Sequence, residues 1–330
     1  MDECVPVTQA SLIRENRHSP VLQPASIGCL RDVPAINVGR GCSFGCVYCY
    51  ARSYRHAPAG GGVSVYANLA ERLCRELDNP RRRKPWPRYV SVNTATDSFQ
   101  PFEELLEISY RALKALLERG IGVSLLTKGW IPPEFIELFA AHPDHVFIKI
   151  GLNSLREDLW KLSEPRAASP QQRLDNLSRL AQAGIRQGVR IDPLLPGLSD
   201  QAEDLQALFR ALASRGIRAV SLSYLVLRPA ILHQLRQELP PAHAQRITAH
   251  YLGSPWEQVA ASHCTQLLPV DRRERAYQKI ASLAAGEGIA VEVCRCKNPD
   301  LPVGLCDLEG REVFRSVAPG GARQLSLFRG

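Results

Sequence analysis

The chain has 330 residues, of which 45% are hydrophobic and 22% are charged, and its formal net charge is +8. This composition is typical of a soluble globular protein with an ample core, and the length suits one barrel-type domain or two ordinary ones. The sequence contains no run of eighteen apolar residues that would suggest a membrane span, and its first residues lack the basic and apolar regions of a signal peptide. We therefore expect a cytoplasmic protein.

Short strand-like runs alternate with amphipathic helices after an irregular leader over residues 1–32. Strands are expected at residues 35–39, 88–94, 121–128, 145–153, 188–195 and 217–227. Helices are expected at residues 68–78, 103–120, 132–142, 169–184 and 199–216. This alternation predicts an α/β fold with a parallel sheet. Six such strands indicate a complete or partial β/α barrel, with its active site at the carboxyl ends of the strands.

The regular alternation fades near residue 229. Two helical stretches, a short strand at residues 289–294 and a loose tail follow it. We therefore divide the chain into a leader (1–32), a partial (β/α)6 barrel (33–228), a C-terminal helical extension containing cysteines (229–315) and a tail (316–330).

Three of the ten cysteines, Cys42, Cys46 and Cys49, lie in one loop directly after the first expected strand. In a reducing compartment, clustered cysteines indicate a metal site or catalysis more often than disulfides. Thiolates are soft ligands for zinc, copper(I) or iron–sulfur clusters. A zinc site completed elsewhere, three unrelated thiols, or a [4Fe–4S] cluster with one open iron all remain compatible with the spacing alone.

The spacing CxxxCxxC, with Tyr48 directly before the last cysteine, resembles the signature of the radical S-adenosylmethionine (SAM) superfamily. Further stretches resemble the spore photoproduct lyase family and its broader set of DNA repair photolyase relatives. These stretches are CVYCYAR (46–52), TATDSFQPFEE (94–104), LLTKG (125–129), LSEPRAASPQQRL (162–174) and DPLLPGLSD (192–200). The resemblance covers roughly residues 33–225.

The resemblance implies a partial radical SAM barrel in which Cys42, Cys46 and Cys49 bind a [4Fe–4S] cluster. The open iron of such a cluster binds the amino and carboxylate groups of SAM. An electron, supplied by a reductant such as flavodoxin or ferredoxin, then cleaves the sulfonium bond. The resulting 5′-deoxyadenosyl radical abstracts a hydrogen atom from the substrate, so the chemistry comes from the cofactor.

The resemblance also assigns residues to SAM. Tyr48 would pack near the adenine, Thr96 and Asp97 would hold the amino group, and Lys128 would lie near the carboxylate or ribose. Weaker candidates at the same edge of the barrel are Asn153, Glu164, Arg166 and Arg190. For each, an ordinary solvated or capping polar residue is the alternative.

Two positions depart from the family pattern. Thr94 stands where spore photoproduct lyase carries the cysteine that returns a hydrogen atom to the product radical, and the O–H bond of a threonine is too strong to replace it. Tyr50 and Cys74 are candidate donors instead, although the helical register of Cys74 also suits a buried core thiol. Phe44 stands where close relatives usually carry histidine.

A second cysteine group follows in the C-terminal region: Cys264, Cys294, Cys296 and Cys306. Four thiolates suit either an auxiliary [4Fe–4S] cluster or a structural zinc ion, and unrelated core thiols are the alternative. Cys4 and Cys29 carry no readable signal.

The tail contains Gln324, Leu325, Leu327 and Phe328 in the sequence QLSLF. This pentapeptide resembles the segment by which bacterial replication and repair proteins bind the DNA sliding clamp. Short exposed segments of this kind bind by ordering onto a preformed groove. A tail that packs its own apolar residues is the alternative.

A basic segment precedes the second expected strand and contains one tryptophan. Its members are Arg81, Arg82, Arg83, Lys84, Trp86 and Arg88. Cations neutralise phosphates and an aromatic ring stacks on an exposed base, so the segment suits DNA, as the net charge does. A solvated loop with an anchored tryptophan is equally compatible.

We predict a radical SAM enzyme that acts on DNA, by repair of a damaged or cross-linked base, and is recruited by the sliding clamp. Radical modification of a peptide or RNA is a second hypothesis. A third is a non-enzymatic adaptor that binds DNA and the clamp and has a structural cluster.

Overall fold

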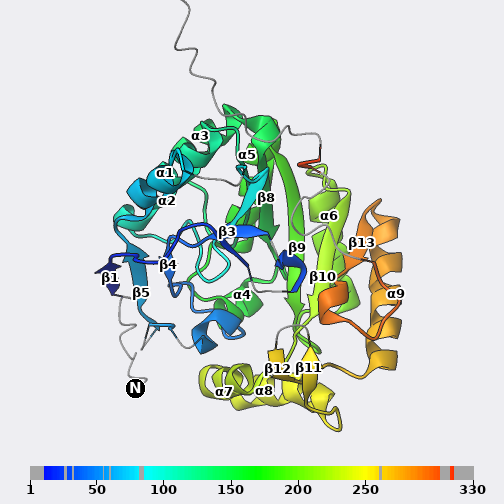
Figure 1. Cartoon of the computed structure of the whole chain (residues 1–330). Coiled ribbons are helices and arrows are strands. Elements are labelled where there is room, and N and C mark those ends of the chain that lie inside the picture. The colour runs from blue at the N-terminus through cyan, green and yellow to red at the C-terminus, as the bar shows by residue number, and fades with distance from the viewer. Residues whose placement is uncertain are drawn as a thin grey trace, which may run out of the picture.

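The computed structural model describes residues 11–25, 28–31, 33–54, 56–58, 61–81, 85–259, 262–304 and 313–315, with the side chains of residues 262 and 263 left out. A curved sheet of eight strands runs through the centre of this part of the chain (Figure 1). In spatial order its strands are β13 (Ala290–Val293), β10 (Ala219–Tyr224), β9 (Arg186–Leu194), β8 (Val146–Gly151), β7 (Gly122–Thr127), β6 (Tyr89–Val92), β3 (Pro34–Ile36) and β2 (Gln23–Pro24).

Neighbouring strands of this sheet are parallel, except that β2 is antiparallel to β3. The register places Val90 beside Val123 and Val123 beside Val146, so buried apolar rows cross the sheet. No pairing between β13 and β2 closes the described sheet into a barrel. The predicted α/β class and partial barrel are therefore confirmed.

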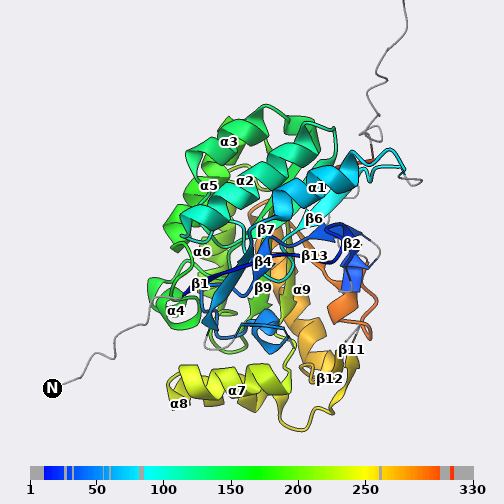
Figure 2. The ribbon, with the colours of Figure 1, turned by 60° about the vertical axis from the view of Figure 1, so that its left-hand side comes forward.

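The helices lie along the outer face of the sheet and at its carboxyl edge (Figures 1 and 2). They are α1 (Leu69–Leu77), α2 (Glu103–Leu117), α3 (Pro133–Ala140), α4 (Glu157–Ser163), α5 (Pro170–Gln182), α6 (Ala202–Ala213), α7 (Pro229–Glu238), α8 (Pro241–Thr248) and α9 (Val270–Gly286). Short 3₁₀ turns are η1 (Gly28–Leu30), η2 (Tyr50–Ser53), η4 (Pro143–His145), η5 (Ala249–Tyr251) and η6 (Arg295–Lys297).

Local sequence explains how these helices form. In α6, Leu205, Leu208, Phe209 and Leu212 recur at helical spacing and are buried against the sheet. In α5, the Ser169 side chain accepts a hydrogen bond from the backbone of Gln172, whose own side chain binds the Ser169 backbone. This capping box satisfies two backbone donors and fixes where α5 begins.

The strand expected at residues 35–39 is divided between two sheets. After β3, Val38 N–H donates to Asn93 Oδ1, so the backbone leaves the large sheet. The chain then enters β4 (Gly39–Arg40), which pairs with β5 (Val63–Tyr66), and β5 pairs with β1 (Leu12–Glu15). Gly39 has no alternative here, since a Cβ would lie 1.9 Å from Ser64 O.

The two ends of the chain contribute more strands than the sequence indicated. The expected irregular leader supplies β1 and β2, and the strand expected at residues 289–294 is β13, which extends the central sheet beside β10. A separate hairpin forms from β11 (Glu257–Val259) and β12 (Ser262–Thr265). Helices α7 and α8 lie at the carboxyl end of the strands (Figure 1). Within the described residues, every helix is too short or too polar to traverse a bilayer.

Phe314 fills the amino end of the barrel. Its ring is 1% exposed and stacks on Tyr89, with ring centroids 4.6 Å apart. It also lies against the first residue of β7, where a Cβ on Gly122 would come within 2.6 Å of its ring. One aromatic side chain therefore fills space that two strands leave open.

We expect Phe314→Ala to lower the free energy of unfolding by about 3–5 kcal/mol, because it leaves a cavity that the strands close only in part. Urea denaturation measures the change. Trp256→Ala is the control, since Trp256 is 44% exposed, and it should cost no more than about 0.5 kcal/mol. Equal effects of the two substitutions would contradict this packing role.

Candidate active site

The loop that carries Cys42, Cys46 and Cys49 lies between β4 and η2, at the carboxyl edge of the sheet. Ser43 N–H donates to Gln100 Oε1 at 2.6 Å, and Val47 N–H donates to Ser163 O at 3.0 Å. These contacts hold the loop against the segment after β6 and against the end of α4. The loop is therefore a fixed structural element.

An arginine holds the middle of this loop. Arg166 Nε donates to Ser43 O, and its backbone N–H donates to Phe44 O at 3.2 Å. A Cβ on Gly45 would lie 2.6 Å from Arg166 Nη2, and Gly45 has a φ of +66°. The glycine therefore lets the guanidinium approach the loop backbone.

The three loop thiols are half-buried and interact electrostatically. Burial raises the pKa of Cys42 and of Cys46, and the neighbouring carboxylates Asp97 and Glu164 raise them further. Thiolates at these positions need a cationic partner. The three sulfur atoms of the loop do not all lie within 4.8 Å of one another. Among the described residues, three cysteines that do lie this close are Cys29, Cys294 and Cys296. The wider spacing in the loop fits a cube that holds each thiolate on a separate iron.

Helix α7 covers the end of the same loop. Gln234 Nε2 donates to Cys49 O at 3.3 Å, and Arg52 in η2 forms an ion pair with Glu238 at 2.5 Å. The oxygen Oε1 of Gln234 is buried without a hydrogen-bond partner among the described residues. Because a buried polar atom normally has a partner, this oxygen is a candidate contact for a bound molecule.

A buried carboxylate, Glu164, collects four polar side chains beside the cysteine loop. Tyr48 O–H donates to Glu164 Oε1, Lys128 Nζ lies 3.0 Å from the same oxygen, and Asn153 Nδ2 lies 3.2 Å from it. Arg173 forms an ion pair with the other carboxylate oxygen. The side chains of Glu164 and Arg173 are 4% and 1% exposed, so this network is shielded from water.

The same network tunes the basicity of Lys128. Burial lowers the pKa of Lys128 to about 8, although the anionic form of Cys46 would raise it. Burial also raises the pKa of Glu164, and Arg173 opposes that change. Lys128 Nζ lies 3.1 Å from Tyr48 Oη, so the ammonium, the phenol and the carboxylate form one connected group.

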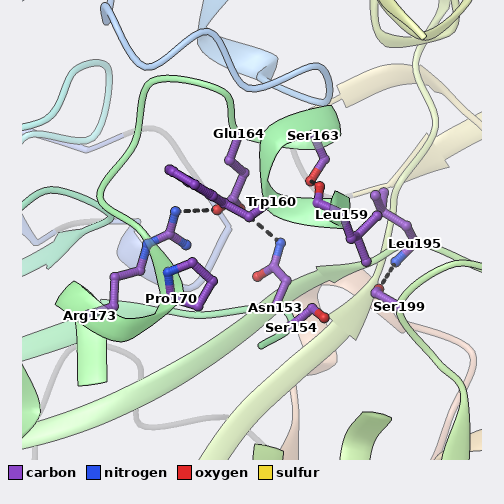
Figure 3. A pocket seen from close by; sticks show the side chains of 10 residues that line it. All are labelled: Asn153, Ser154, Leu159, Trp160, Ser163, Glu164, Pro170, Arg173, Leu195 and Ser199. Carbon is purple, nitrogen blue, oxygen red and sulfur yellow. Dashed lines mark hydrogen bonds and ion pairs between the residues drawn. The ribbon is translucent and has the colours of Figure 1, made fainter. Parts of the chain in front are cut away.

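Asn153 places a second buried oxygen at the site. Its Nδ2 is used by Tyr48 and Glu164, while its Oδ1 is buried and has no partner among the described residues. Figure 3 shows its side chain between Glu164 and the sheet, in a cavity of about 10 Å³, which is room for about one water molecule. The cavity is lined by Asn153, Ser154, Leu159, Trp160, Ser163, Glu164, Pro170, Arg173, Leu195 and Ser199. It is too small to hold SAM itself.

Thr96 and Asp97 lie at the end of β6 and make internal contacts. Thr96 O–H donates to Gly41 O at 2.5 Å. The carboxylate of Asp97 accepts from Thr127 Oγ1 at 2.8 Å and from Lys128 N at 3.0 Å. Burial raises the pKa of Asp97, and these hydrogen bonds oppose the shift. Asp97 therefore joins the ends of β6 and β7.

Arg190 pairs with Asp192 on β9, and Asp192 also binds Lys297 of η6 at 2.6 Å. Burial opposes ionisation of Asp192, but the two cations outweigh it, so its pKa is lowered. A segment from the C-terminal extension therefore lies beside a residue predicted to contact SAM.

Tyr50 lies next to the cysteine loop and beside Thr94. Its O–H donates to Thr94 O at 2.8 Å, its ring is 5.7 Å from that of Tyr54, and Arg228 lies 5.7 Å from its centroid. Tyr50 is 37% exposed as a residue. Burial of its hydroxyl raises its pKa, so the phenol stays protonated.

Two other predicted groups lie away from this site. Cys74 packs against the core and lies on helix α1, which packs against α2 outside the sheet. Trp86 donates to Leu77 O at 3.0 Å and packs on the core. Trp86 and Arg88 of the basic segment directly precede β6, so these two residues lie at the amino edge of the sheet, opposite the cysteine loop.

Several predicted residues lie outside the described part of the chain: Arg82, Arg83, Lys84, Cys306, Gln324, Leu325, Leu327 and Phe328. Of the basic segment, Arg81 is exposed, and Arg88 donates to the backbone of Arg315 at 3.1 Å.

The second cysteine group differs in membership from the predicted one. The thiols of Cys29, Cys294 and Cys296 all lie within 4.8 Å of one another. Contact with Cys29, then contact with Cys294, and then burial raise the pKa of Cys296. Cys264 is exposed on β12 and does not belong to this group of described residues. Cys29 was not predicted to be a member of this group.

Gln100 and Arg173 were also missed. Gln100 binds Ser43, Thr96 and the backbone of Asp97, and Arg173 binds Glu164 together with the carbonyls of Ala168 and Gly151. Both residues belong to sequence stretches that resemble the spore photoproduct lyase family, and this resemblance could have identified them as candidates.

We expect Glu164→Gln to lower the free energy of unfolding by about 3 kcal/mol, because Arg173 and Lys128 would then be buried without an anion. Urea denaturation measures the loss. The control is Glu157→Gln, which removes an exposed partner of Lys161 at 3.1 Å and should cost less than about 1 kcal/mol. Similar losses for both variants would show that the buried network adds little stability.

Comparison with known proteins supports the resemblance of the cysteine loop to the radical SAM superfamily. A family model described as the radical SAM superfamily matches residues 36–222, more than half of the chain. An uncharacterised protein of Mycobacterium tuberculosis is 28% identical over 263 residues, which are 76% of this chain and 73% of that protein.

Two viral proteins are also similar. One, an uncharacterised protein of Acidianus two-tailed virus, is 26% identical over 202 residues, 58% of this chain and 66% of that protein. The other, from Pseudomonas phage M6, is named a radical SAM Nalpha-GlyT isomerase and is 26% identical over 212 residues, 63% of this chain and 43% of that protein. The chain thus spans less than two thirds of the length of these two relatives.

Among solved structures, a cysteine-to-serine mutant of spore photoproduct lyase matches with a TM-score of 0.68 over 86% of this chain and 82% of that one. Spore photoproduct lyase complexed with dinucleoside spore photoproduct matches with a TM-score of 0.66 and the same coverage. At 15% identity, these matches show a shared fold. The chain therefore belongs to the radical SAM superfamily, and it is an enzyme whose family implies a [4Fe–4S] cluster and SAM as cofactors.

Proposed function

We propose that this radical SAM enzyme acts on DNA and repairs a damaged or cross-linked base. The main support is the fold shared with spore photoproduct lyase, which has been solved with a dinucleoside spore photoproduct. The ordered series of sequence stretches that resemble that family adds to it. Fold alone does not define a substrate, so the residues around the cysteine loop carry the rest of the argument.

Cys42, Cys46 and Cys49 would hold the cluster, since they share one fixed loop at the carboxyl edge of the sheet. The bound cluster and SAM would supply a 5′-deoxyadenosyl radical. The chain's own residues would orient SAM and exclude water. Burial raises the pKa values of Cys42 and Cys46, and these thiols fit the role of cluster ligands because a cationic cluster would compensate their thiolates.

The Glu164 network would orient SAM. The ammonium of Lys128 is a candidate partner for the SAM carboxylate, and the buried Oδ1 of Asn153 is a candidate acceptor for an amino or hydroxyl group. Hydrogen bonds from Lys128 and Asn153 to the Tyr48 hydroxyl would hold Tyr48 in place. Thr96 and Asp97 would act through the backbone, because their side chains already bind Gly41, Thr127 and the Lys128 backbone.

The surroundings of Tyr50 fit a nucleic acid. Tyr50 and Tyr54 present aromatic rings next to the cysteine loop, and Arg228 lies over the Tyr50 ring. Unpaired bases stack on aromatic rings, and guanidinium groups contact phosphates. The net charge of +8 favours the same class of partner.

Tyr50 is also the candidate that could return a hydrogen atom to the product radical. Its hydroxyl touches the backbone of Thr94, the position at which the resemblance expects a cysteine. The raised pKa keeps the phenolic hydrogen in place. Cys74 is the weaker candidate, because it lies on α1 and packs against the core, away from the cysteine loop.

A second reaction class is favoured by the phage relative, whose name describes an isomerase. On that reading the substrate radical would rearrange before it recovers a hydrogen atom. Radical modification of a peptide or RNA is the remaining alternative. Labelled DNA, RNA and peptide substrates distinguish these reactions.

The decisive experiment measures SAM cleavage by the anaerobically reconstituted enzyme with deuterium-labelled DNA, either ultraviolet-irradiated or intact. We expect irradiated DNA to raise formation of 5′-deoxyadenosine at least about tenfold, with deuterium transferred into it. Cys46→Ala should abolish cleavage, whereas Cys264→Ser, on the exposed strand β12, should retain it. Tyr50→Phe should keep cleavage but lower product recovery.

Unchanged cleavage in Cys46→Ala would refute the cluster assignment. Deuterium transfer from labelled peptide or RNA, with none from DNA, would refute the DNA substrate. A rearranged base as the product would favour the isomerase class.

We also propose recruitment by the bacterial DNA sliding clamp through Gln324, Leu325, Leu327 and Phe328. A flavodoxin or ferredoxin would supply the electron. Immobilised clamp should retain the full chain, and Leu327→Ala/Phe328→Ala should lower retention at least about tenfold, because two apolar anchors are lost. Ser326→Ala is the matched control and should bind normally. Undiminished binding by the double variant would contradict the docking role.

A further inference from the structure

Three thiols from opposite ends of the chain meet at one point. Cys29 lies in η1, Cys294 directly follows β13, and Cys296 lies in η6. Their sulfur atoms all lie within 4.8 Å of one another, and those of Cys294 and Cys296 are 2.8 Å apart. Cys294 is 1% exposed, and the other two are half-buried.

The meeting point lies between the two ends of the open sheet. Strand β13 forms one edge of the sheet, and β2 with β3 forms the other. Along the chain, η1 connects β2 to β3. No backbone pairing links these ends among the described residues. Figure 2 shows the blue segment around β2 beside the orange segment that follows β13. The three thiols therefore stand where a bond could join the sheet's free ends.

Buried hydrogen bonds fix the turn that carries Cys294 and Cys296. Asn298 Nδ2 donates to Cys294 O at 2.9 Å, while its Oδ1 accepts from Arg273 at 2.9 Å and from Tyr277 at 3.1 Å. Metal ligands are commonly held by such a surrounding layer of hydrogen bonds.

On the opposite side, a glycine allows the close approach. A Cβ on Gly28 would lie 3.0 Å from Cys296 Sγ, and Gly28 has a φ of +36°. The absence of a side chain at this position lets η1 bring Cys29 against η6.

We propose that Cys29, Cys294 and Cys296 bind one zinc ion that joins the two ends of the open barrel. Thiolates around a tetrahedral zinc ion, with Zn–S bonds near 2.3 Å, lie ~3.8 Å apart, and all three sulfur atoms fall within 4.8 Å of one another. The sulfur atoms of Cys294 and Cys296, which are 2.8 Å apart, would move apart by about 1 Å when they bind the ion. Thiolates on separate irons of a cube lie further apart than thiolates around one zinc ion. The fourth position falls to water.

A disulfide is a poor alternative for this group. The enzyme needs the loop cysteines as thiolates for its cluster, so it must work in reducing surroundings, where disulfides do not persist. A disulfide would also join only two of the three sulfur atoms. One ion accounts for all three.

The proposed ion would also support the active site. Lys297, the residue after Cys296, binds Asp192 at 2.6 Å, and Asp192 pairs with Arg190 on β9. A fixed η6 therefore holds a cation beside the carboxyl edge of the sheet. The zinc ion would thus have a structural role, with Lys297 as its connection to the site.

The test is the metal content of the cluster-loaded enzyme, purified anaerobically from cells supplied with iron and zinc. Mass spectrometry of the metals should give about one zinc and about four irons per chain. Cys29→Ser should lower zinc at least about fivefold and leave iron unchanged. Cys29→His, which keeps a zinc ligand, should retain at least about half of it. X-ray absorption at the zinc edge should show sulfur neighbours.

Two variants serve as controls. Cys264→Ser should keep its zinc, since Cys264 lies outside the group, and Cys46→Ala should lose iron but keep zinc. The proposal is overturned by wild-type enzyme without zinc, by about eight irons in place of four, or by zinc that survives Cys29→Ser. Zinc lost from Cys46→Ala but kept in Cys29→Ser would place the ion in the cluster loop instead.

Discussion

The buried carboxylate of Glu164 is the interaction on which the site depends. It binds a phenol from the cysteine loop, an ammonium from the end of β7, an amide from the segment after β8 and a guanidinium from α5. Four segments that are distant in sequence are thereby held at one edge of the sheet. Because two buried cations need this anion, the loop cannot move away without a large electrostatic cost.

That constraint separates residues that could contact SAM from residues that position them. Lys128 and Asn153 still offer groups to a ligand, whereas Asp97 and Gln100 are occupied by contacts within the protein. Sequence resemblance placed Thr96 and Asp97 beside SAM, and the structure shows their side chains joining β6 to the cysteine loop and to β7.

Local sequence patterns predicted those features of the structure that depend only on residues close together in the chain. The alternation of strands and helices, the capped start of α5 and the spacing of Cys42, Cys46 and Cys49 could all be read from the sequence. Contacts between distant segments could not. Cys29 has no pattern around it and becomes informative only because η1 meets η6. The break between β3 and β4 likewise depends on the distant side chain of Asn93.

The open sheet gives the C-terminal extension a role in the site itself. A closed barrel would fix its carboxyl edge through strand pairing alone, but here β13 and β2 are left unpaired with each other. The extension compensates at two places: α7 binds the cysteine loop through Gln234 and the adjoining η2 through Glu238, and η6 binds β9 through Lys297. Both contacts act on the edge where the cluster would lie. Residues beyond the barrel therefore help to hold this edge in place, together with the strands of the barrel itself.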